Sequence, residues 1–118
     1  MLVVEDELFL RLDLMELAQH EGFDTLEAGN AHEALEILEQ RSDVKVVFTD
    51  IRMPGDLDGL ALAHIIRKRW PLTVVVICSG NEPPTEAAMP SGATFMPKPC
   101  TGPKVHLLMS DIRSTLAH

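Results

Sequence analysis

Long hydrophobic runs are missing from this sequence of 118 residues. The longest run extends only from Val74 to Cys78, whereas a membrane-spanning helix needs about 20 apolar residues. The opening run from Met1 to Val4 meets acidic residues at once and has no basic flank, unlike a signal peptide. The sequence therefore predicts neither a membrane span nor a signal peptide.

Tyrosine is absent, and cysteine is limited to Cys78 and Cys100. The separation of these two residues does not match a metal-binding motif, and two cysteines are too few for a disulfide framework. We expect both thiols to be reduced, which favours a cytoplasmic location, although a disulfide between them stays open as the less favoured alternative.

Positive charge is also scarce. Ten basic residues stand against eighteen acidic ones, and the formal net charge of −8 disfavours direct binding to nucleic acid or to an anionic membrane. The chain does have enough apolar material to fold, because 46% of its residues are hydrophobic and 24% are charged. Its length fits one domain, so we expect a single unit over residues 1–118.

Short runs rich in Val, Leu and Ile alternate with segments of helical period, which is typical of βαβ units around a parallel sheet. The predicted strands are residues 2–4, 23–28, 44–49, 73–78 and 93–96. The predicted buried helix faces carry Leu8, Leu12 and Met15; Ala31, Ala34, Leu35 and Leu38; and Val105, Leu108, Met109, Ile112 and Leu116.

Helix boundaries are marked by polar caps and by breakers. Asn30 and Asp58 are predicted N-caps of the second and third helices, and the third should end at the basic turn 67–69 before Pro71. Residues 81–92 hold three prolines and end in Gly92, so at most a short or irregular fourth helix fits there.

Polar residues follow the predicted strands at one edge of the sheet, where ligands bind in open parallel folds. They are Glu5 and Asp6, then Asp50, Ser79 and Lys98. Converging carboxylates need a cation, and hard oxygen ligands favour Mg²⁺. Taken singly, Asp6 could be a helix N-cap, Ser79 a turn residue and Lys98 a solvated lysine. Together they are the groups needed to hold a phosphoryl group.

These residues carry a resemblance over essentially the whole chain. Four motifs stand in the order found in receiver domains of bacterial two-component response regulators. They are Val4-Glu5-Asp6-Glu7, Asp50-Ile51-Arg52-Met53-Pro54 with Gly59, Ser79-Gly80 and Lys98-Pro99. The sequence resembles that family. The resemblance implies a flavodoxin-like (βα)5 doubly wound parallel sheet with strand order 2-1-3-4-5.

The resemblance also implies a role for each site residue. Asp50 would accept a phosphoryl group, Ser79 and Lys98 would contact its oxygens, and Ser79 and Phe95 would act as switch residues. Mg²⁺ would be held by Asp6, Asp50, the backbone carbonyl of Arg52 and, through a water, Glu5. Glu5 stands where an aspartate is more usual, and the Arg52 side chain is expected to pair with Glu5 or Glu82.

The implied partners are a sensor histidine kinase or histidine phosphotransfer protein and a downstream protein target. We expect a cytoplasmic phosphoacceptor that catalyses its own phosphorylation and dephosphorylation. It would be a monomer or a weak phosphorylation-dependent dimer. It would be either a stand-alone receiver or the input domain of a longer regulator. The alternatives are a small Mg²⁺-dependent phosphatase-like enzyme and a binding module that works without phosphorylation. No second aspartate two residues from Asp50 supports the phosphatase.

Overall fold

The computed structural model describes residues 1–53, 55–80, 88–98 and 102–116. Its strands are β1 (Leu2–Val4), β2 (Leu26–Ala28), β3 (Val46–Asp50), β4 (Val74–Ser79) and β5 (Thr94–Pro97). Its helices are α1 (Leu8–His20), α2 (Ala31–Gln40), α3 (Gly59–Arg69) and α4 (Pro103–Leu116). The strands form one parallel sheet in the order β2-β1-β3-β4-β5, which confirms the predicted fold class.

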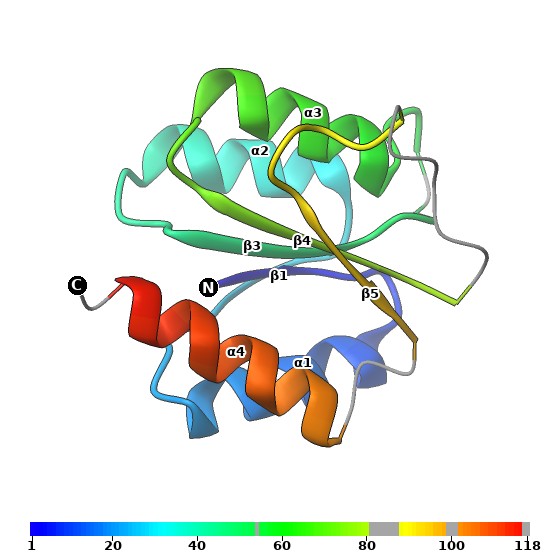
Figure 1. Cartoon of the computed structure of the whole chain (residues 1–118). Helices are drawn as coiled ribbons and strands as arrows, with labels where there is room; N and C mark the ends of the chain where they lie inside the picture. The colour runs from blue at the N-terminus through cyan, green and yellow to red at the C-terminus, as the bar shows by residue number, and fades with distance from the viewer. Residues whose placement is uncertain (54, 81–87, 99–101, 117–118) are drawn as a thin grey trace.

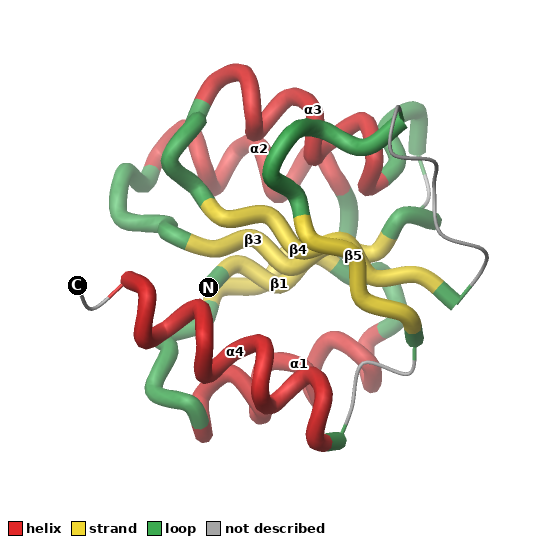
Figure 2. Tube along the Cα trace, viewed as in Figure 1, coloured by secondary structure: helices red, strands yellow, loops and turns green. Residues whose placement is uncertain are grey.

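The sheet is covered by helices on both faces. Figures 1 and 2 show α1 and α4 on one face and α2 and α3 on the other. In β1, β3, β4 and β5, alternate residues enter opposite cores, so that Val47 packs on the α2/α3 side while Phe48 packs on the α1/α4 side. Both faces are buried, which explains why the central strands are continuous apolar runs.

The predicted buried face of the first helix is wrong at Leu8 and Leu12 and right at Met15, which is partly buried against the α1/α4 core. Leu8 and Leu12 are 49% and 45% exposed, whereas Leu14 and Ala18 are the buried residues of α1. The first half of this helix carries leucines on several sides, so more than one apolar stripe satisfies the helical period. The expected face of α2 is confirmed by buried Ala31, Ala34 and Leu38. In α4, Val105, Met109 and Ile112 are buried as expected, but Leu116 is 39% exposed, so the expectation for this last residue is wrong.

Polar side chains cap the N-termini of α1, α2 and α3. The side chains of Asn30 and Asp58 accept hydrogen bonds from Glu33 N and Ala61 N, as predicted for α2 and α3. At α1 the N-cap is Glu7, whose carboxylate accepts from the backbone N–H groups of residues 9 and 10. The alternative in which Asp6 caps this helix is therefore wrong, and the Asp6 carboxylate is available to the site.

Some sequence-based expectations fall partly outside the described residues. Residues 81–87 of the expected fourth helix lie outside the described residues, and the described stretch 88–93 contains turns. Buried Cys78 is disulfide-bonded, so the expectation of a reduced thiol at this position is wrong, and Cys100 lies outside the described part of the chain. None of the described helices is long and apolar enough to cross a membrane.

Candidate functional site

The acidic residues meet because β1 and β3 are neighbours in the sheet. Val4 is paired with Thr49, so Glu5 and Asp6, just beyond β1, lie beside Asp50 at the end of β3. Their carboxylate oxygens come within 4.8 Å of one another. Glu5 and Asp50 are buried, while Asp6 is exposed. The site is therefore an acidic pocket, defined as Glu5, Asp6 and Asp50, that opens to solvent at Asp6.

Lys98 brings the compensating charge from the far strand of the sheet. Its Nζ donates to Asp50 Oδ2 at 2.9 Å and to Glu5 Oε1 at 3.2 Å. Its backbone N–H donates to Ser79 O at 2.9 Å, which extends the pairing of β4 with β5 and directs the lysine towards the pocket. The Lys98 side chain is 27% exposed, against 3% for Glu5 and 10% for Asp50. Three carboxylates and one ammonium still leave an excess of negative charge.

Burial and this crowding shift the ionisation of two groups. Burial and the charge and hydrogen bonding of Asp50 raise the pKa of Glu5 from 4.5 to about 7, although Lys98 acts in the opposite direction. For Lys98, burial works against the charged form, but the hydrogen bonds and charges of Asp50 and Glu5 outweigh it and raise the pKa. The ammonium is therefore retained at neutral pH, whereas Glu5 titrates there.

The pKa of Glu5 predicts a pH-dependent stability. A carboxyl group whose pKa is raised in the folded state binds protons more tightly there, so stability falls as pH rises from 4.5 to about 7. In EDTA we expect the free energy of unfolding to drop by about 3 kcal/mol at most across this window. Urea unfolding at several pH values checks this. Glu5→Gln should remove the drop, whereas the control Glu36→Gln, on the exposed side of α2, should keep it.

The backbone after Asp50 is held by a glycine. Gly59, the first residue of α3, donates its N–H to Ile51 O at 2.7 Å. A Cβ built at this position would overlap the backbone carbonyl oxygen of Asp50. The same carbonyl accepts a hydrogen bond from Thr49 Oγ1 at 2.9 Å. The Asp50 main chain can therefore keep these contacts only if position 59 is a glycine.

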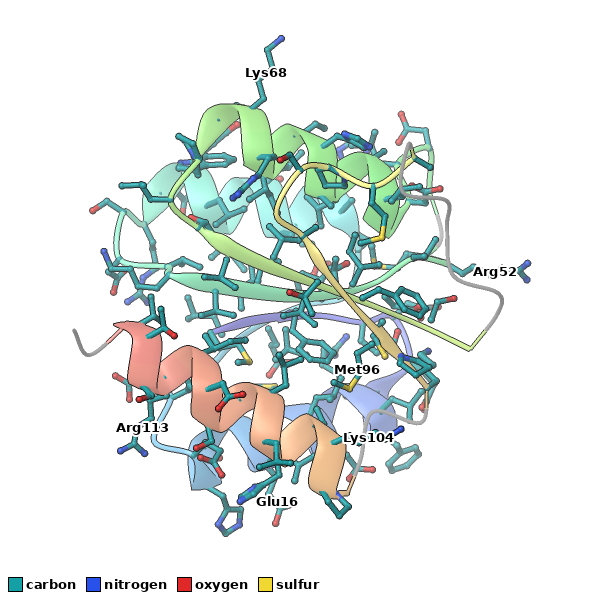
Figure 3. The ribbon with its side chains drawn as sticks, in the orientation of Figure 1. Glu16, Arg52, Lys68, Met96, Lys104 and Arg113 are labelled. Carbon is teal, nitrogen blue, oxygen red and sulfur yellow. The ribbon has the colours of Figure 1, made fainter. Side chains whose placement is uncertain are left out.

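The remaining predicted site residues lie on β4, on β5 and just after β3. Ser79 is buried at the end of β4, and Phe95 is half-buried on β5 and packs against the α2/α3 core. Arg52 is exposed, and Figure 3 shows its side chain extending outward. The expected pairing of Arg52 with Glu5 is wrong because Lys98 is the partner of Glu5, and Glu82 lies outside the described residues.

One residue at the site was missed from the sequence. Arg11, in the second turn of α1, donates from Nη1 to the backbone carbonyl of Glu5 at 2.9 Å. Apolar periodicity identifies only the buried faces of a helix, so it assigns no role to an arginine between them. Its position six residues after Glu5, on the helix that follows the acidic pair, is the available signal.

The pocket fits a hard divalent cation. All ligand atoms of the cluster are carboxylate oxygens, which suit Mg²⁺, Ca²⁺ or Mn²⁺ better than zinc. The excess negative charge of the cluster would also be reduced by such an ion. Glu5, Asp6 and Asp50 are therefore the residues that could hold it.

Comparison with known proteins agrees with this arrangement. The sequence model described as the response regulator receiver domain matches residues 1–110. The putative response regulator NtrX-like of Rickettsia bellii is 33% identical over 112 residues, which cover 92% of this chain and 23% of that protein. The sensor kinase CckA of Brucella abortus is 35% identical over 102 residues, covering 83% of this chain and 11% of that kinase. The chain thus spans a minor part of both relatives.

Solved structures give the same result. The crystal structure of the receiver domain of NtrX from Brucella abortus is 34% identical and superposes with a TM-score of 0.84. The similarity covers 97% of this chain and 98% of that one.

Proposed function

Because this chain belongs to the response regulator receiver domain family, we propose that it is a single receiver domain over residues 1–118 and that Asp50 accepts the phosphoryl group. The observation that carries this proposal is the contact of Lys98 Nζ with Asp50 Oδ2 beside two further carboxylates. An ordinary surface carboxylate has neither a partly buried ammonium at 2.9 Å nor an acidic cluster around it. Receiver domains are regulatory phosphoacceptors, not enzymes as such.

The proposed reaction is a phosphoryl transfer from a histidine. A carboxylate oxygen of Asp50 attacks the phosphorus of a phosphohistidine, the new O–P bond forms as the P–N bond breaks, and the electron pair remains on the imidazole nitrogen. The product is an acyl phosphate on Asp50. Hydrolysis by attack of water on the phosphorus regenerates the carboxylate and inorganic phosphate. We assign both reactions to this domain, without a separate enzyme.

Residues of the pocket have distinct tasks in this reaction. Asp6, Asp50 and the backbone carbonyl of Arg52 would hold Mg²⁺ directly and Glu5 through a water, and the ion would supply positive charge for the phosphoryl oxygens. Lys98 adds an ammonium on the side of β5 and offsets charge at Asp50. Ser79, at the end of the neighbouring strand, is proposed to donate its hydroxyl to a phosphoryl oxygen.

The switch is proposed to run along β4 and β5. The backbone N–H of Lys98 donates to Ser79 O, so movement of either residue towards a phosphoryl group would displace the ends of both strands. Phe95 lies on β5 and packs against the α2/α3 core, where it would repack. The phosphoryl group shifts the conformational equilibrium only through contacts that differ between the two states, and these are its bonds to Ser79 and Lys98.

The proposed partners follow from the same chemistry. The phosphodonor is a sensor histidine kinase or a histidine phosphotransfer protein, in keeping with the similarity to the sensor kinase CckA of Brucella abortus. The output partner is a protein that binds the surface formed by β5, α4 and the described stretch 88–93. We place the domain in the cytoplasm, where such donors present their phosphohistidine, as a monomer or a weak phosphorylation-dependent dimer.

Incubation with Mg²⁺ and acetyl phosphate tests the proposed function directly. We expect intact-mass spectrometry to show the addition of one phosphoryl group, and we expect excess EDTA to suppress it by at least about tenfold because the carboxylates then repel the incoming phosphate. A binding module that works without phosphorylation would show no added mass. A phosphatase-like enzyme would release inorganic phosphate in many turnovers without a stable adduct.

Lys98→Ala is expected to uncouple phosphorylation from switching. Loss of one charge-assisted hydrogen bond should weaken binding of the phosphate mimic beryllofluoride by about tenfold or more. Even at saturating beryllofluoride, the change in hydrogen exchange over residues 88–97 should disappear. Lys104→Ala, which removes an exposed lysine of α4, is the matched control and should respond like the wild type. A normal exchange response in Lys98→Ala would show that the lysine has only a structural role.

A further inference from the structure

We propose that Arg11 is a positioning residue that sets the Mg²⁺ affinity of the acidic pocket by fixing the main chain between Glu5 and Asp6. This inference rests on the proposed function only in taking Mg²⁺ as the ion bound by the pocket. Arg11 touches neither Asp50 nor Lys98 in any contact of the structure's described residues. It acts on the backbone from which two of the three carboxylates extend.

The guanidinium of Arg11 is fixed by two neighbouring strands. Nη1 donates to Glu5 O at the end of β1, and Nε lies 3.2 Å from Glu27 Oε1 on β2. The Arg11 side chain is only 16% exposed. Nε is buried and makes no hydrogen bond of good geometry, so the bond to the Glu5 carbonyl is the directional contact. A side chain placed in this way restrains the position of that carbonyl.

Glu5 is the residue that this contact controls. Its N–H donates to Ala28 O on β2 at 3.0 Å, and its carboxylate accepts from Asp6 N at 3.0 Å. The Glu5 backbone is therefore held by β2 through its N–H and by α1 through its carbonyl. Rotation of the peptide that follows would swing the Asp6 N–H away from the Glu5 carboxylate and move both carboxylates relative to Asp50.

A glycine provides the space in which the guanidinium lies. A Cβ added to Gly29 would stand 3.2 Å from Arg11 Nη1, closer than ordinary van der Waals contact. Gly29 does not have a positive φ, so its backbone conformation does not require glycine. Alanine at this position would push the guanidinium by a few tenths of an ångström without changing Arg11 itself.

The contact works through geometry more than through charge. The shifted pKa of Glu5 has Asp50 and Lys98 among its causes, and Arg11 is not one of them. The positive charge of Arg11 is opposed by Glu27. Groups that orient metal ligands without touching the metal commonly change metal affinity by 10–100-fold when they are removed. We expect an effect near the lower end of this range, because Arg11 holds the backbone and not a ligand atom.

The test is Mg²⁺ binding by the full chain, measured by isothermal titration calorimetry on folded protein. Arg11→Ala should weaken binding by about tenfold. Arg11→Lys keeps one donor and should recover part of the affinity. Gly29→Ala should weaken binding in the same direction by a smaller factor. Glu27→Gln leaves the bond to Glu5 O in place and should bind as the wild type.

Arg113→Ala is the matched control. This arginine also donates from Nη1 to a backbone carbonyl, that of Glu21 at 2.6 Å, and Figure 3 shows it at the opposite end of the molecule from Arg52. The Arg113→Ala variant should have a lower free energy of unfolding than the wild type and an unchanged Mg²⁺ affinity. Wild-type affinity in Arg11→Ala, or equal losses in Arg11→Ala and Arg113→Ala, would overturn the inference.

The inference can still be tested if Arg11→Ala does not fold or if the wild type is not phosphorylated. If Arg11→Ala does not fold, Gly29→Ala still decides, and wild-type affinity in that variant overturns the inference. Failure of wild-type Asp50 to become phosphorylated would overturn the proposed function but leave the titration results intact. Normal phosphorylation with no effect of Arg11 on Mg²⁺ binding would overturn this inference alone.

Discussion

Asp50→Asn is expected to abolish phosphorylation while the fold is retained. The amide has nearly the same shape as the carboxylate, but it is neutral and a poor nucleophile, so the acyl phosphate cannot form. Intact-mass spectrometry after incubation with Mg²⁺ and acetyl phosphate should show no adduct on the variant. The substitution also removes the charge that helps to raise the pKa of Glu5. We therefore expect a weaker fall of stability between pH 4.5 and 7 than in the wild type.

Asp56→Asn is the matched control for this experiment. Asp56 lies only six residues further along, is 83% exposed and pairs with His32 at 2.6 Å, outside the acidic pocket. It should be labelled as fully as the wild type. Full labelling of Asp50→Asn would identify another acceptor and refute the assignment of Asp50. Loss of labelling in both variants would indicate a general effect on the protein and would equally count against Asp50 as the specific site.

The sequence predicted the arrangement of the acidic residues because of topology. Residues at the carboxyl ends of parallel strands share one edge, and the resemblance to receiver domains supplied the strand order that makes β1 and β3 neighbours. Glu5, Asp6 and Asp50 therefore meet as expected. The strand boundaries were less accurate, since the second predicted run began at residue 23 and β2 begins at Leu26.

Side-chain contacts between distant segments could not be predicted in this way. The bond between Lys98 and Glu5 joins residues 93 positions apart, and no periodicity or spacing rule encodes which carboxylate a lysine reaches. Arg52 illustrates the same limit, because one of its two expected partners was Glu5, and Lys98 pairs with that carboxylate instead. For α1 the ambiguity is local, since its leucines satisfy several helical stripes and tertiary packing selects Leu14 and Ala18.

Gly59 shows how a residue without functional groups supports the chemistry. It is the first residue of α3 and has no positive φ, so helix propensity alone would favour alanine there by at most about 1 kcal/mol, the value for a helix interior. Steric overlap works against this preference. The added Cβ would overlap the Asp50 carbonyl oxygen and approach the Ile51 Cα at 2.9 Å, and both are backbone atoms that cannot rotate away.

Gly59→Ala is therefore expected to destabilise the protein by about 3 kcal/mol, at the upper end of overpacking effects, because relief requires α3 to shift away from β3. The same shift would move the Asp50 carbonyl and its side chain, so phosphorylation of the fraction that remains folded should slow by at least tenfold, roughly as for other misplaced reacting groups. Urea unfolding and intact-mass time courses measure the two effects. Gly80→Ala is the control, because its Cβ would stand 3.7 Å from Lys98 Cβ, an ordinary contact. Wild-type stability in Gly59→Ala would show that the backbone after Asp50 can move aside at little cost. The glycine would then not determine the position of the phosphoacceptor.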